Sequence, residues 1–382
     1  MANGRAATAG TTALAPPSAP GHSPLARAAR WARANLFNSW IGSAVTLLLG
    51  YLLIKMLVGL ISWGFVNAIW TLPDAANGVS DTRICREARA ESACWALITE
   101  RYRFILFGTY PYAEQWRGAV VIVLFLALYG VSAMRQFWNI KLVGIWAAGL
   151  TAIAVFMWGG VFGLTYVEQE KWGGLPLTLI LATFGIAFAF PLSILVALGR
   201  RSEMPAIRYI CVAYIELIRG VPLISVLFMA SVMFPLFLPE GITIDKLLRA
   251  QVAIIMFTAA YLAEVVRGGL QAIPKGQYEA ADALGLGYWK KTGLIVLPQA
   301  LRICIPPMVG SFIGLFKDTS LVTIIGLYDL LGAAKASIVE PRWVGFGVEA
   351  YIFISIIYFV FCFAMSKYSQ NLEVEFSRHS KR

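Results

Sequence analysis

The sequence predicts an all-α integral membrane protein with about eight transmembrane helices. Of its 382 residues, 59% are apolar and only 14% are charged. The mean hydropathy of +0.70 is too high for a soluble domain, which could not bury so much apolar surface. The apolar residues also gather in runs long enough to cross a bilayer as helices.

Eight such runs follow one another along the chain. Arg27, Arg30 and Arg33 precede the first run and basic residues follow the last, so the positive-inside rule predicts that both termini are cytoplasmic. Residues 1–33, rich in Ala, Pro, Gly and Thr, predict a disordered cytoplasmic tail, and 371–382 predict a second tail. The expected spans are 40–70, 118–134, 142–167, 175–198, three lying within 209–238, 248–270 and 301–331, and 348–365.

The formal net charge of +11 has the sign expected of a protein that binds nucleic acid. Many of the basic residues, however, flank apolar runs, as they do in the cytoplasmic loops of membrane proteins. We therefore interpret them as topology signals, and we expect membrane lipid as the surroundings and no nucleic-acid partner.

Composition divides the chain into a Trp-rich accessory region, 34–171, and a working core, 172–370. The accessory region contains a long polar loop, 71–117, which the topology places on the periplasmic side. A disulfide between Cys85 and Cys94 is chemically allowed there, and two free thiols are equally compatible with the sequence. The other cysteines lie in apolar runs, where we expect them to pack: Cys211, Cys304 and Cys362.

A polar segment, 272–300, separates the sixth and seventh spans on the predicted cytoplasmic side. Pro274 and Gly276 are expected to end the sixth helix, and Glu279 to lie near the start of a short helix whose dipole it complements. Small residues beside it would let another protein approach closely, whereas the alternative is an ordinary polar loop. The segment contains Glu279-Ala280-Ala281, three residues, Gly285, nine residues, and Ile295-x-Leu297-Pro298.

This spacing resembles the EAA motif of binding-protein-dependent ABC permeases. Four further runs, 214–223, 260–269, 297–302 and 316–321, are similar to the polar amino-acid branch of that family. The segment 35–40 is similar to the larger permease subunits of general L-amino-acid importers.

The resemblance implies a type I ABC importer (MetI-like) permease core of five helices, matched by the last five expected spans, with three additional N-terminal helices. It implies import of L-amino acids across a bacterial inner membrane. The implied partners are a cytoplasmic ATPase dimer that binds ATP and Mg²⁺, a second permease subunit that forms a heterodimer, and a periplasmic amino-acid-binding protein. The residues implied to couple to the ATPase are Glu279, Ala280, Ala281, Gly285, Ile295, Leu297 and Pro298.

Ionisable residues inside membrane spans are costly and often functional. Glu216 and Arg219 are three residues apart, as are Glu264 and Arg267, so each pair can share a helix face. Such pairs would either fix helix packing or take part in gating. A further polar group would either line a path for a zwitterionic amino acid or form an internal ion pair: Lys317, Asp318, Thr319 and Ser320.

Several kinds of active site are missing from the sequence. It has no Gly-x-x-x-x-Gly-Lys-Ser/Thr pattern, so we expect no P-loop ATP site. The only histidines, His22 and His379, lie in the tails, so we expect no histidine metal site in the membrane. No arrangement of a nucleophile and a base is visible, so we expect no enzyme activity, and we expect no cofactor in this chain. The alternative function is a secondary, ion-coupled transporter or a channel, but Asp318 is the only plausible deep carboxylate and no internal repeat is visible.

Overall fold

The computed structural model describes residues 24–73 and 81–380. Within these residues the chain is almost entirely helical, and its extended pairing is limited to two isolated bridges. Seven of the described helices are long and apolar enough to cross a membrane, and a pair of helices bent by 102° makes an eighth candidate span. The predicted all-α membrane fold is therefore confirmed.

Packing divides the chain into two compact units, Met1–Ala68 with Glu91–Ala93 and Ile69–Ala90 with Cys94–Arg382. The described part of the first unit contains α1 (Pro24–Asn35) and the apolar α2 (Trp40–Ile61). The prediction of a disordered tail is wrong for its described part, because Ala and Arg are strong helix formers and extend α1 through that stretch. Residues 1–23 lie outside the described residues.

The predicted polar loop 71–117 is partly helical in its described part and belongs to the second unit, except for Glu91–Ala93. It forms α3 (Arg83–Glu87) and α4 (Ala96–Phe107), and a disulfide joins Cys85 to Cys94. A small apolar core, which includes the two cysteines, Leu97, Trp343 and Phe346, lies between this stretch and the chain that follows α14 (Leu330–Val339). An ion pair between Arg101 and Glu340 also joins the two segments.

Two accessory helices, α5 (Gln115–Ala133) and α6 (Ile140–Trp158), pack against each other. Arg117 is fully buried in this pair and donates hydrogen bonds to the carbonyl oxygens of Phe156 and Thr165. The prediction that the third span continues to residue 167 is wrong, because left-handed glycines directly after Trp158 end the helix.

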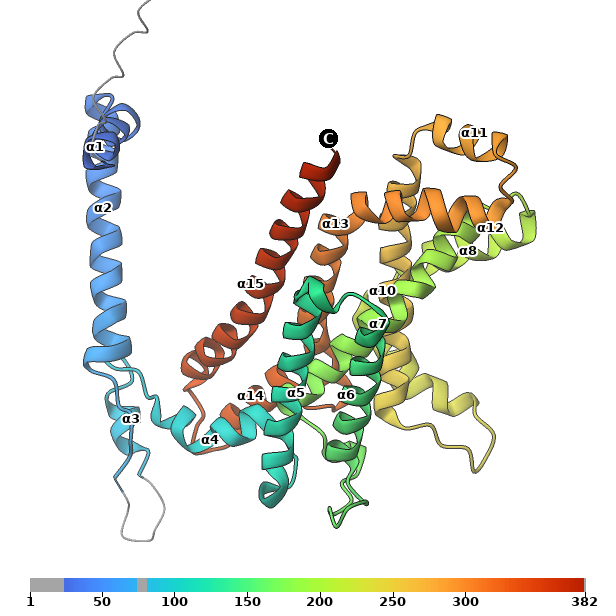
Figure 1. The fold of residues 1–382 in the computed structure, drawn as a ribbon. Coiled ribbons are helices and arrows are strands. Elements are labelled where there is room, and N and C mark those ends of the chain that lie inside the picture. The colour runs from blue at the N-terminus through green and yellow to red at the C-terminus, as the bar shows by residue number, and fades with distance from the viewer. Residues whose placement is uncertain (1–23, 74–80, 381–382) are drawn as a thin grey trace, which may run out of the picture. The chain divides into compact units, whose positions relative to one another are not determined.

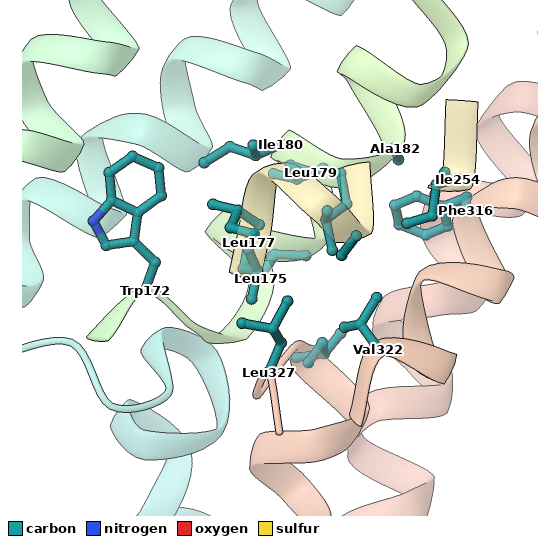
Figure 2. Packing of buried hydrophobic residues seen from close by; sticks show 14 of the residues in the cluster. Trp172, Leu175, Leu177, Leu179, Ile180, Ala182, Ile254, Phe316, Val322 and Leu327 are labelled. Carbon is teal, nitrogen blue, oxygen red and sulfur yellow. The ribbon is translucent and has the colours of Figure 1, made fainter. Parts of the chain in front are cut away.

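The centre of the second unit is α7 (Gly174–Arg200). Its N-terminal half is apolar except for Thr178 and Thr183 and is almost completely buried, as expected of a helix surrounded by other helices. Figure 2 shows Leu177 and Leu179 from this helix in the same cluster as Ile254, Phe316 and Val322, which come from elements far along the chain.

The other core elements follow in order. The pair α8 (Pro205–Arg219) and α9 (Leu223–Phe228), with the turns that continue to Phe237, forms the bent span. The last helix is longer than predicted and continues through the described part of the expected C-terminal tail. Figure 1 shows α11 (Lys275–Ala283) and α12 (Tyr288–Lys291) at the same end of this unit as the C-terminal end of α15 (Gly347–Ser380), whereas α4 and α14 lie further toward the opposite end. The long helices are α10 (Lys246–Gln271), α13 (Leu297–Asp318) and α15 (Gly347–Ser380).

Candidate functional site

The polar segment 272–300 folds into α11 (Lys275–Ala283), α12 (Tyr288–Lys291) and a π turn that leads into α13. Gly285 ends α11 with a backbone φ of +70°, a conformation that glycine adopts without strain. Two local predictions are wrong. Gly276 lies inside α11 rather than in the turn, and Glu279 lies beyond the first helical turn, which contains no acidic residue to complement the dipole.

One face of this segment is firmly packed against the core. Ala281, Val296 and Ala300 are at most 1% exposed. Val296 and Ala300 belong to a second apolar cluster, separate from the large core, that includes Ile215 of α8 and Leu270 of α10. The segment is therefore a packed structural element and not a loose loop.

Polar contacts fix the two halves of the segment to each other. Lys291 Nζ lies 2.6 Å from the Asp282 carboxylate, which joins α12 to the end of α11. The Gln299 side-chain amide donates to the Gln277 side chain at 3.1 Å and to the Ile295 carbonyl at 2.8 Å. Since these contacts span α11, the π turn and α13, we expect the segment to move as one body.

The opposite face of the segment is exposed. Glu279, Ala280 and Gly285 are all solvent-accessible, and so are large apolar side chains that the pattern of the motif does not include. Leu284 is 76% exposed and Trp289 is 73% exposed. Exposed apolar groups on a segment between spans are typical of a protein-docking surface.

Length indicates that this segment extends beyond the membrane. Tyr288–Ile325 forms one continuous helical run of 38 residues. At 1.5 Å per residue such a run is about 57 Å long, whereas a bilayer core of about 30 Å needs roughly 20 residues. The first part of the run, which exposes Trp289 and Leu294, can therefore lie outside the hydrocarbon.

The predicted ion pairs at the end of the core form one cluster instead of two separate pairs. The Glu264 carboxylate contacts Arg267 at 2.9 Å and Arg219 at 3.8 Å, and it also accepts a hydrogen bond from Arg200. Glu216 pairs with Arg200 at 3.2 Å rather than with Arg219. The cluster thus joins the ends of α7, α8 and α10 beside the bend that follows α8.

The polar group of the seventh span divides between two environments. Lys317 and Ser320 line an open cavity of about 450 Å³ together with Tyr358 and Cys362 of α15. Thr319, in contrast, is fully buried and donates its hydroxyl hydrogen to the Phe316 carbonyl at 2.9 Å. Asp318 is not among the residues that line this cavity. The structure therefore brings only part of the predicted group to one surface.

Sequence reasoning missed two residues at this end of the core, Arg201 and Tyr278. The Tyr278 hydroxyl donates to the Leu270 carbonyl oxygen at 3.1 Å, and Arg201 Nη1 donates to the same oxygen at 3.1 Å. Arg201 was visible in the sequence only as a basic residue next to a span. Tyr278 directly precedes Glu279, and that position was the only signal available for it.

Known proteins resemble this chain over most of its length. A family model described as "Binding-protein-dependent transport system inner membrane component" matches residues 189–373. The chain is 48% identical over 371 residues to the inner membrane amino-acid ABC transporter permease protein YhdY of Escherichia coli (strain K12), covering 95% of this chain and 97% of that protein. It is 36% identical over 416 residues to the glutamate/glutamine/aspartate/asparagine transport system permease protein BztC of Rhodobacter capsulatus, covering 92% of this chain and 94% of that protein. A solved structure, an amino acid ABC transporter with histidines, is similar over 53% of this chain and 92% of its own chain, with 30% identity and a TM-score of 0.47.

The fold defines a multi-pass membrane protein with a packed, partly exposed polar segment between two of its spans. The extent of the similarity identifies it further: the chain belongs to the family of binding-protein-dependent transport system inner membrane components. Permeases of this family are translocation components that work with an ATPase and a substrate-binding protein.

Proposed function

We propose that the chain is the permease subunit of an ATP-driven importer of L-amino acids, and that the segment 272–300 couples it to a cytoplasmic ATPase dimer. The observation that carries this proposal is the two-sided character of the segment. One face is packed into the core, and the other exposes Glu279, Ala280, Leu284 and Trp289 to a partner. The amino-acid substrate class is supported by the names of relatives that align with nearly the whole chain.

The segment suits a coupling role because it is stiff and connects directly to two spans. It follows α10 after a short turn and continues without a break into α13. A displacement of its exposed face by the ATPase would therefore move the ends of both helices together. ATP and Mg²⁺ bind the partner subunits in this proposal, while this chain holds no cofactor and no metal.

The remaining parts of the assembly follow from the same proposal. A periplasmic amino-acid-binding protein delivers the substrate, and a related permease subunit forms a heterodimer with this chain. The chain spans a bacterial inner membrane, and both of its termini lie on the cytoplasmic side. The C-terminal end of α15 lies at the same end of the second unit as α11, in agreement with this orientation (Figure 1).

The test exchanges the exposed apolar residues of the segment for polar ones. Leu284→Ser with Trp289→Ser should lower the amount of ATPase that co-purifies with the permease and the ATP-driven uptake of amino acids in proteoliposomes. Met204→Ser is the matched control, because Met204 is 58% exposed in the turn between α7 and α8, outside the segment. Uptake that persists at the wild-type rate after the ATPase is lost would instead support the ion-coupled transporter.

A further inference from the structure

We propose that Arg201 and Tyr278 form a positioning link that transmits movement of the segment 272–300 to α7 and to the ionic cluster at the bend. This link adds a non-covalent connection to the covalent ones through α10 and α13. The inference rests on the proposed coupling function, since it names residues through which the coupling acts.

The link is built around one backbone oxygen. Leu270 lies in the last turn of α10, where the helix leaves its carbonyl groups without intrahelical partners. Its oxygen accepts two hydrogen bonds, from Arg201 Nη1 and from the Tyr278 hydroxyl, both at 3.1 Å. Arg201 Nη1 also donates to the Tyr278 hydroxyl oxygen at 3.2 Å. Three helices, α7, α10 and α11, therefore meet at a single acceptor.

The tyrosine contributes more than its hydroxyl group. The Arg201 guanidinium carbon lies 5.7 Å from the centre of the Tyr278 ring, a cation–π distance. The same ring packs against the apolar cluster that includes Leu270, Ile273 and Val296. Because the ring is held by packing and the hydroxyl by polar contacts, displacement of α11 must displace Arg201 or break these contacts.

The neighbouring residue connects the link to the ionic cluster. Arg200 precedes Arg201 at the end of α7, and its guanidinium contacts the carboxylates of Glu216 and Glu264. Glu264 in turn contacts Arg219, the last residue of α8 before the 102° bend. A continuous set of contacts thus runs from α11 through two consecutive arginines to the break in the fifth span. Networks of packed side chains, hydrogen bonds and ion pairs of this kind can carry coupling between distant sites.

The experiment uses the assembled importer, reconstituted with its ATPase, its partner permease and its binding protein, and supplied with a mixture of radiolabelled L-amino acids. The variants are Tyr278→Phe, Arg201→Gln and the double substitution. Tyr209→Phe and Arg208→Gln are the matched controls, because both residues are exposed on the first turns of α8. The quantities measured are ATPase co-purification, ATP hydrolysis and amino acid taken up per ATP hydrolysed.

We expect each single variant to retain the ATPase and to lower uptake per ATP by about fivefold or more, a typical strength of coupling between two sites. Uptake per ATP in the double variant should be no lower than in either single variant, because both residues act in one link. The inference is overturned if uptake per ATP stays at the wild-type value, if the two losses multiply, or if the variants release the ATPase. Absence of ATPase from the wild-type complex would instead refute the proposed function itself.

Discussion

Replacement of Glu264 by glutamine tests whether this carboxylate holds the end of the core together. Glu264 is shared by three arginines from three helices, and its side chain is only 16% exposed. Removing one partner of a buried ion pair costs about 3–5 kcal/mol. Since the arginines keep some access to solvent and the glutamine oxygen still accepts a hydrogen bond, we expect a loss of about 2–3 kcal/mol in unfolding free energy.

Glu216→Gln provides the internal comparison on the same cluster. Its carboxylate is 60% exposed and makes one ion pair, with Arg200 at 3.2 Å, so its removal should cost no more than about 1 kcal/mol. Denaturant titration in detergent, followed by tryptophan fluorescence, measures both losses. If Glu216→Gln destabilises the protein as much as Glu264→Gln, the cluster is not centred on Glu264 and the reasoning is refuted.

Two further predictions concern a turn and a buried acid. Gly285→Ala should lower the unfolding free energy by about 1 kcal/mol and reduce the amount of ATPase that co-purifies, because φ is +70° at Gly285. Gly287→Ala is the control and should change both quantities little, because φ is −65° there. Equal effects of the two substitutions would contradict this prediction. Burial raises the pKa of the Asp329 carboxyl above its usual value of about 4. The folded protein therefore binds the carboxyl proton of Asp329 more tightly than the unfolded chain does. The unfolding free energy is thus highest at pH values below about 4, and it falls as the pH rises through the raised pKa of the folded state. Asp329→Asn should remove this dependence of the unfolding free energy on pH. If the unfolding free energies of the wild type and the variant change in parallel with pH, Asp329 is not the group responsible.

Sequence patterns predicted the spans well because each depends on a local property, a run of apolar residues. Where the predicted end of a span was wrong, the boundary depends on a property other than hydropathy. The third span ends early at Trp158, where backbone glycines and not hydropathy decide the boundary. The helices inside the loop 71–117 were missed because their burial depends on Trp343 and Phe346, far along the chain.

The candidate site shows the same limit. The motif fixed the position of the segment 272–300, because its residues are close together in sequence. The contacts of Arg200 with both Glu216 and Glu264 could not be predicted from the sequence, since they depend on how three helix ends meet. For the same reason the sequence does not predict the contact between Arg201 and Tyr278.

The disulfide and the segment 272–300 together constrain the bent span. A structural disulfide between Cys85 and Cys94 indicates an oxidising compartment, whereas the proposed docking of an ATPase places the segment in the cytoplasm. The intervening chain contains α5, α6, α7, the bent pair and α10, so the two sites lie on opposite sides only if the bent pair crosses the membrane. If the pair turned back as a re-entrant loop, both sites would lie on the same side.

Single cysteines on either side of the bent pair test this conclusion. Glu203 and Glu240 are both exposed, in the turns before α8 and before α10. In a background in which Cys211, Cys304 and Cys362 are replaced by alanine, a membrane-impermeant thiol reagent should label Glu240→Cys only from the periplasmic side. Glu203→Cys should react only from the cytoplasmic side. Labelling of both from one side would make the pair re-entrant, and the segment 272–300 would then share a compartment with the disulfide, out of reach of any ATPase.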